Sequence, residues 1–168
     1  MPKSTFLLAV LLLAGTLQTA SAQKTDLFLG GNLIVGFPSG DFKDGYKRAT
    51  GIEGSLGLGG SRVIVLGTLG YMSYKEQSGN PYGKITVIPV KAGLRVYPTK
   101  LLFLTGNAGV GFLKDETMSS REARFVYDAG IGLHLIVAQI SLHYDAWKRQ
   151  NTNGYTGAVL LKFGIAIK

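Results

Sequence analysis

The stretch Arg124–Trp147, RFVYDAGIGLHLIVAQISLHYDAW, decides the fold. Apolar residues alternate with small or polar ones at a period of two over Arg124–Leu135, and again over Val137–Trp147. Successive side chains of a β-strand point to opposite faces, so this alternation predicts two strands that each have one apolar face. A short connection near His134–Val137 joins them, which is typical of consecutive antiparallel strands.

The same period recurs outward from this stretch in both directions. The other alternating segments are Asp26–Phe37, Gly51–Gly59, Lys84–Tyr97, Leu101–Leu113 and Tyr155–Ile167, and Arg62–Tyr74 is a further strand with apolar residues on both faces. Strands of about 10–13 residues are twice the usual globular length and match a tilted membrane-spanning strand. Beyond the N-terminal leader, the chain has no unbroken apolar run of the roughly 18 residues that a membrane helix needs.

The connections between these segments alternate in length. The long ones are Ser39–Thr50, Lys75–Lys84, Lys114–Arg124 and Lys148–Gly154, and the short ones lie near Gly59–Arg62, Pro98–Lys100 and His134–Val137. An outer-membrane barrel has tight turns at one end and long loops at the other. Lipid contact also requires a closed sheet, because an open edge would leave backbone groups unsatisfied in hydrocarbon. We therefore predict an all-β fold, an eight-stranded antiparallel up-and-down transmembrane β-barrel.

The N-terminus has the features of a secretory signal peptide, Met1–Ala22. Lys3 supplies the positive charge, Phe6–Gly15 is a short apolar run, and Ala20-Ser21-Ala22 is a small-residue cleavage site. The mature chain, residues 23–168, then has 168 − 22 = 146 residues, enough for a single domain. The sequence contains no cysteine, which excludes disulfides, a catalytic thiol and a thiolate metal site.

Three parts of the chain resemble the small bacterial outer-membrane barrels to which outer-membrane protein X and the outer-membrane protein A barrel belong. They are the leader with Ala20-Ser21-Ala22, the segment GFPSGDFKDGY at Gly36–Tyr46, and the closing strand Val159–Ile167. The resemblance implies an outer-membrane location. An even number of strands returns the chain to its starting side, so we expect both termini in the periplasm. The resemblance also implies insertion by the barrel assembly machinery, although the chain ends in Ile167-Lys168 rather than in the aromatic residue common in that family.

The face opposite the apolar one carries isolated charges among glycines and small polar residues. Eight strands enclose an interior that side chains can just fill, and buried charges need partners. We therefore predict a structural charge network inside the barrel, formed by Glu53, Lys91, Arg95, Asp128, Asp145 and Lys162. Three acids against three bases would leave this network neutral, and the lumen filled.

The long loops are rich in basic residues. Cations beside the phosphates of lipopolysaccharide are favoured electrostatically, which makes outer-membrane lipid and lipopolysaccharide the expected partners of a basic rim. Its candidate residues are Lys47, Arg48, Arg121, Arg124, Lys148 and Arg149. Nucleic acid is not an expected partner, because the leader exports the chain and its charges do not form one exposed stripe. We expect a monomer.

No catalytic, cofactor or metal site is predicted. His143 and Asp145 share an inner face with Ser141, but Ser141 would lie toward the middle of the barrel. The paired glycines are not followed by a helix, as a phosphate-binding loop requires. The sequence favours a non-enzymatic outer-membrane barrel that displays loops for envelope structure, adhesion or partner binding. Two alternatives stay open: a lipocalin-like carrier of a lipophilic ligand, and a lipid-modifying enzyme.

Overall fold

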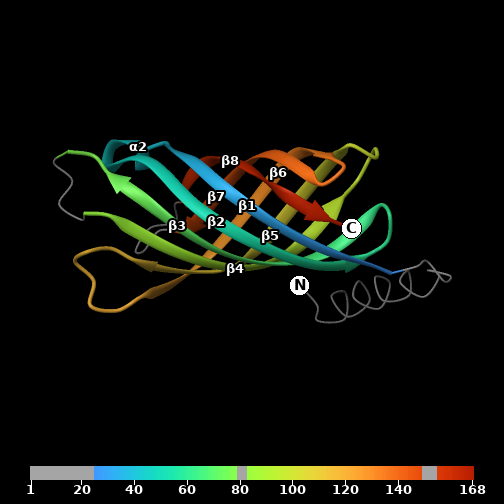
Figure 1. Cartoon of the computed structure of the whole chain (residues 1–168). Coiled ribbons are helices and arrows are strands. Elements are labelled where there is room, and N and C mark those ends of the chain that lie inside the picture. Colours follow the sequence, from blue (N-terminus) through green and yellow to red (C-terminus); the bar gives the residue numbers. More distant parts are fainter. Residues whose placement is uncertain (1–24, 79–82, 149–154) are drawn as a thin grey trace, which may run out of the picture.

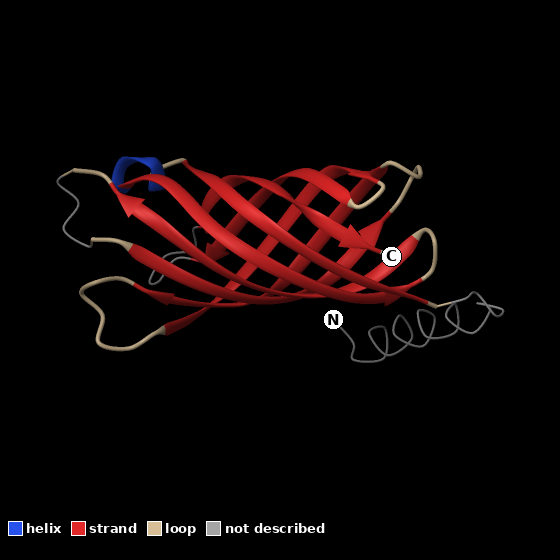
Figure 2. Ribbon diagram, in the orientation of Figure 1, coloured by secondary structure: helices blue, strands red, loops and turns tan. Residues whose placement is uncertain are grey.

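A computed structural model of the chain describes residues 25–78, 83–148 and 155–168. Over these ranges, eight antiparallel strands form a closed barrel, in which each strand pairs with the next in sequence and the last pairs with the first (Figures 1 and 2). The strands are β1 (Asp26–Ser39), β2 (Tyr46–Gly59), β3 (Val63–Glu76), β4 (Ile85–Val96), β5 (Leu102–Lys114), β6 (Glu122–Leu135), β7 (Ala138–Lys148) and β8 (Tyr155–Ile167). The predicted eight-stranded up-and-down barrel is therefore confirmed, while the predicted signal peptide, residues 1–22, lies outside the described residues.

The two ends of the barrel differ in the length of their connections. Short turns join β2 to β3, β4 to β5 and β6 to β7 at the right-hand end of Figure 1, where the C-terminus also lies. The ammonium group of Lys168 donates there to the backbone oxygen of Ser61, at 2.6 Å. The opposite end carries the longer connections, including the single helical turn α2 (Phe42–Gly45) between β1 and β2. No helix among the described residues is long and apolar enough to cross a membrane.

The first long connection and the last short turn are shorter in the structure than in the sequence analysis. Strand β2 already begins at Tyr46, so the predicted loop Ser39–Thr50 is wrong over its last five residues, where Tyr46 and Ala49 are buried inside the barrel. His134 and Leu135 belong to β6, which leaves a two-residue turn at residues 136 and 137. Such hairpin turns need a positive φ at a central residue, and Ile136 supplies it at 60° although it is β-branched.

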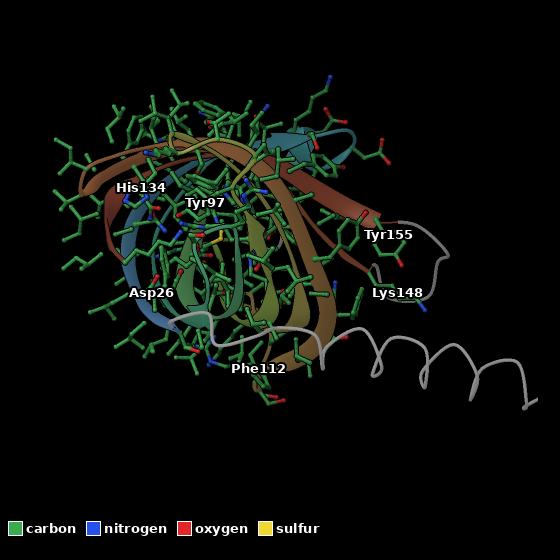
Figure 3. The ribbon with its side chains drawn as sticks, turned by 90° about the vertical axis from the view of Figure 1, so that its right-hand side faces the viewer. Asp26, Tyr97, Phe112, His134, Lys148 and Tyr155 are labelled. Atoms are coloured by element: carbon green, nitrogen blue, oxygen red, sulfur yellow. The ribbon has the colours of Figure 1, made fainter. Side chains whose placement is uncertain are left out.

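The outer face of the wall is apolar over most of its length. Large side chains alternate outward on every strand and are exposed by about half, for example Leu33 at 65%, Leu69 at 58% and Ile165 at 62%. Figure 3 shows side chains standing both inside the ring of strands and radiating from its outer surface. A soluble monomer rarely exposes an apolar area this continuous, so this face needs an apolar environment.

The inner face forms three layers along the barrel axis. An apolar layer at the short-turn end contains Phe28, Ile64, Leu66, Tyr97, Phe103 and Ala166. A larger apolar layer at the long-loop end contains Ile34, Phe42, Tyr46, Ala49, Met72, Tyr74, Val87, Leu113, Val126, Trp147, Ala158 and Leu160. Buried polar and charged residues lie between them. This layering explains why both faces of β3 look apolar in sequence: the inward side chains of this strand cross both apolar layers.

Inward glycines make room for the large side chains of the middle layer. A Cβ atom at Gly130 would lie 2.5 Å from Cγ of His143, and one at Gly132 would lie 2.5 Å from Cβ of Ser141. Atoms cannot approach so closely, and both neighbours are buried. A side chain at either glycine would therefore displace part of the interior.

Candidate functional site

The centre of the lumen is a cluster of charged side chains from five strands. Lys91 on β4 is hydrogen-bonded to Asp128 on β6, and its Nζ lies 3.3 Å from Oδ1 of Asp145 on β7. Its distance to Oε2 of Glu53 on β2 is 3.7 Å. Lys162 on β8 donates to both oxygens of Glu53, at 2.8 and 2.9 Å. Because these strands span most of the circumference, the cluster crosses the interior of the barrel.

Five of the six residues named from the sequence thus lie together, but Arg95 does not join them. Its Nη1 donates to Oε1 of Gln139 at 2.9 Å, and its guanidinium carbon lies 4.6 Å from the ring centre of Phe28 and 4.1 Å from that of Phe103. Arg95 lies four residues beyond Lys91, toward the short-turn end, and so reaches the aromatic layer. Cation–π contacts of this kind strengthen where water is excluded.

Two uncharged or weakly basic residues complete the cluster. The predicted charge network did not include them, although the sequence analysis placed His143 on the inner face. Nδ1 of His143 lies 3.0 Å from Oδ1 of Asp128, and Nδ2 of Asn107 donates to the same oxygen at 2.9 Å. Both residues have the inward parity of their strands, which is the signal that could have identified them. The contacts between strands follow from the register, which no pattern within one strand reveals.

The balance of charge inside the cluster differs from the predicted neutral set of six. Glu53, Asp128 and Asp145 face only Lys91 and Lys162, because Arg95 lies in the neighbouring layer. Three acids and two bases leave one carboxylate in excess in this cluster, and the third base of the predicted network, Arg95, binds Gln139 instead. In the described part of the chain, no group of three or more His, Asp or Glu residues has the arrangement of a metal site.

A Ser–His–Asp chain runs through this cluster. Nε2 of His143 lies 3.0 Å from Oγ of Ser141, while Nδ1 faces Asp128. Hydrolases use this connectivity to activate a serine. Ser141 is only 5% exposed, however, and Asp128 is also held by Lys91 and Asn107. A substrate needs a path to the hydroxyl and donors for an oxyanion, and the neighbours of Ser141 fill the space around it.

Aromatic side chains cover the lumen at the long-loop end. The helical turn α2 places Phe42 over the opening, with ring-centre distances of 4.6 Å to Tyr46 and 5.1 Å to both Tyr74 and Trp147. A cavity of about 330 Å³ remains beside this group, lined also by Asp115 on the β5–β6 loop. The connection between β1 and β2, which lies within the segment Gly36–Tyr46, therefore covers the lumen at this end.

The candidate rim residues Lys47, Arg48, Arg121, Arg124 and Lys148 lie at the long-loop end, and Arg149 lies outside the described residues. Arg124 pairs with Glu122 on its own strand, with an N–O distance of 2.6 Å. Arg121 donates to the backbone oxygen of Phe112 at 3.4 Å. Arg48 is different, because its cross-strand partner is another cation, Lys75.

Comparison with solved structures shows which known proteins share this architecture. No family model matches the chain, and no curated protein matches it. The outer membrane protein Ail of Yersinia pestis, in a phospholipid bilayer nanodisc, is 16% identical, with a TM-score of 0.58 over 84% of this chain and all of that one. Ail bound to the heparin analogue sucrose octasulfate is 18% identical, with a TM-score of 0.52 over 85% of this chain and 97% of that one. Neisserial surface protein A (NspA) is 12% identical, with a TM-score of 0.57 over 87% of this chain and 99% of that one. The chain therefore has the fold of the small eight-stranded outer-membrane β-barrels, as its sequence resemblance predicts.

Proposed function

We propose that this protein is an integral outer-membrane barrel without enzymatic activity, which holds its loops at the cell surface for envelope structure, adhesion or partner binding. The main observation behind the proposal is that the barrel has the reverse of a soluble protein's arrangement. Apolar side chains cover the outside of a closed sheet, and the charged cluster lies inside. In such a barrel every strand forms its backbone hydrogen bonds with a neighbouring strand, so the barrel is stable in lipid. Two features support a periplasmic location of the termini: the predicted leader, and the position of Lys168 at the end of the barrel that carries the short turns.

The solved structures support the same proposal. Ail is described as an attachment and invasion locus protein and NspA as a surface protein, and both share this fold. A lipocalin-like carrier would need an apolar interior with room for its ligand. Here Glu53, Lys91, Asp128, Asp145 and Lys162 fill the middle of the lumen, and all are buried. Insertion by the barrel assembly machinery, a monomeric state and contact of the basic rim with lipopolysaccharide belong to this proposal.

Loop replacement tests the display function. The connection at residues 115–121 lies between β5 and β6 at the long-loop end, so a short Gly-Ser turn can replace it without altering the barrel wall. We expect this variant to reach the outer-membrane fraction in wild-type amount but to lose adhesion, partner binding or envelope resistance. Replacing the short turn at residues 60–62 with a turn of equal length is the control. A protein found in the soluble fraction would contradict the proposal.

The Ser141–His143–Asp128 contacts favour one second candidate, a lipid hydrolase. A fluorophosphonate probe reacts with an activated, accessible serine. We expect no labelling of the folded protein, and no difference between wild type and Ser141→Ala, because Ser141 is enclosed. Labelling that disappears in Ser141→Ala and in His143→Gln would establish the hydrolase and remove the non-enzymatic proposal.

A further inference from the structure

The outer surface of β2, β3 and β4 has a layered composition. These strands lie side by side, with their outer ends toward the long loops (Figure 1). Arg48 and Lys75 are direct cross-strand partners, and Lys84 precedes β4 beside them. The period of β2 and β3 places Arg48 and Lys75 outward, and Lys84 lines the same surface hollow as both. They form a cationic row at the level where the wall meets the loops.

Within residues 25–78, 83–148 and 155–168, no carboxylate forms an ion pair with this cationic row. The row lines a hollow of about 380 Å³ together with Glu76 and Glu116. Among the described residues, however, neither carboxylate lies within ion-pair distance of the three cations, whereas Arg124 elsewhere on the rim pairs with Glu122. Like charges directly opposite each other destabilise a sheet. An external anion in the hollow would relieve that repulsion.

Hydroxyl groups lie directly below the cations. Thr50 and Ser73 are cross-strand partners, face outward and line the same hollow. Hydroxyls and cations together are the donors that phosphate oxygens accept from. These donors therefore suit an oxyanion such as a phosphate group better than an apolar group.

An apolar groove begins beside these hydroxyls and crosses the outer surface from β4 over β3, β2 and β1 to β8. It has a volume of about 820 Å³ and is lined by Ile52 and Tyr71, which follow Thr50 and Ser73 on the outward face, and by Leu33 and Phe163. Two outward glycines, Gly31 and Gly54, are cross-strand partners in this lining. Gly54 is six residues from Arg48, or about 20 Å along the strand. At the usual tilt, this is about 15 Å below the cations, roughly half of the hydrocarbon thickness.

We propose that this surface is a binding site for one phosphorylated acyl lipid of the outer leaflet. The headgroup phosphate lies among Arg48, Lys75 and Lys84, with Thr50 and Ser73 as further donors. One acyl chain lies in the groove over Gly31 and Gly54, where larger outward side chains would exclude it. The proposal deepens the proposed function and rests on it, because the groove meets lipid only if the barrel spans the outer membrane.

The test uses the full mature protein refolded into phosphatidylcholine nanodiscs that contain a small fraction of bisphosphorylated lipid A. Native mass spectrometry after detergent exchange counts the lipid A retained per protein. We expect the triple variant Arg48→Gln, Lys75→Gln, Lys84→Gln to weaken retention about tenfold. The matched control is Lys43→Gln, Arg62→Gln, Lys100→Gln, which removes the same charge from exposed residues outside both the hollow and the basic rim and should retain lipid A normally.

The groove is tested by Gly54→Leu. Its added Cβ meets only the backbone oxygen of Leu69, at 4.0 Å, so the variant should fold. Gly106 on β5 is the control, because it also faces outward and a Cβ there meets nothing within 4 Å, but it lies outside the groove. We expect Gly54→Leu to weaken retention at least threefold and Gly106→Leu to leave it unchanged.

Three results would overturn the site. They are equal retention by the two triple variants, equal retention by Gly54→Leu and Gly106→Leu, or equal retention of lipid A and its dephosphorylated form. Complete displacement of lipid A by inorganic phosphate would assign the hollow to a free anion and also contradict the lipid site. A wild-type protein that does not insert into the nanodisc would instead contradict the proposed membrane function itself, so the two failures are distinguishable.

Discussion

Replacement of Lys91 by Met should lower the free energy of unfolding by about 3–5 kcal/mol. Lys91 is the cation that Asp128, Asp145 and Glu53 share, and its side chain is 1% exposed. Methionine fills a similar volume but leaves three carboxylates with only Lys162. Buried like charges then repel one another without water to screen them. Urea unfolding of the protein in lipid vesicles measures the change.

A second variant shows whether the loss comes from charge or from packing. Adding Asp145→Asn to Lys91→Met removes one excess carboxylate, and it should recover part of the lost stability. Lys100 is an exposed lysine at the β4–β5 turn, so Lys100→Met should change stability by less than about 0.5 kcal/mol. If Lys91→Met were as stable as Lys100→Met, the lumenal cluster would not have the structural role assigned to it.

Arginine at an outward position should destabilise the barrel by about 2–4 kcal/mol near the membrane midplane. Ile131 and Leu104 are cross-strand partners that face outward, exposed by 47% and 45%, and Leu161 has the same outward parity on β8. An arginine there must lie in hydrocarbon or distort the bilayer around it. Folding equilibria in vesicles give the magnitude for each position.

The cost of an outward arginine falls toward the membrane surface, and this provides a control for the arginine variants. Leu101 is 53% exposed but lies beside the short turn, where the same change should have an effect of only about 0–1 kcal/mol. Ile131→Met keeps the side chain apolar and should be close to wild type. Outward arginines that fold as well as these controls would show that the apolar face does not contact lipid.

Local sequence pattern predicted the strands and their two faces, because alternation is a property of each strand alone. Ile131 and Leu133 face outward and Asp128 and His134 inward, as the period of two requires. The pattern was wrong where tertiary packing extends a strand. Tyr46 packs against Phe42 of α2 and Ala49 is buried inside the barrel, and β2 begins five residues earlier than the sequence predicted.

The contacts between side chains inside the barrel were harder to predict from the sequence. Inward parity identified Glu53, Lys91, Asp128, Asp145 and Lys162, and the structure brings these five together. Knowing that a residue points inward does not give its height along the barrel axis, because that height depends on the register and tilt of the strands. Arg95 was therefore grouped with a cluster that it does not reach, and the contacts of His143 and Asn107 with Asp128 were not foreseen.

Cysteine accessibility in intact cells tests most directly the claim that this barrel spans the outer membrane with its long loops outside. The chain has no native cysteine, so single cysteines replace Asp44 in α2, Ser119 in the β5–β6 connection, and Ser61 and Thr99 in the short turns. A membrane-impermeant maleimide should label the first two in intact cells, and the last two only after the outer membrane is broken. Labelling of Ser61→Cys and Thr99→Cys in intact cells, with protection of Asp44→Cys and Ser119→Cys, would contradict the account.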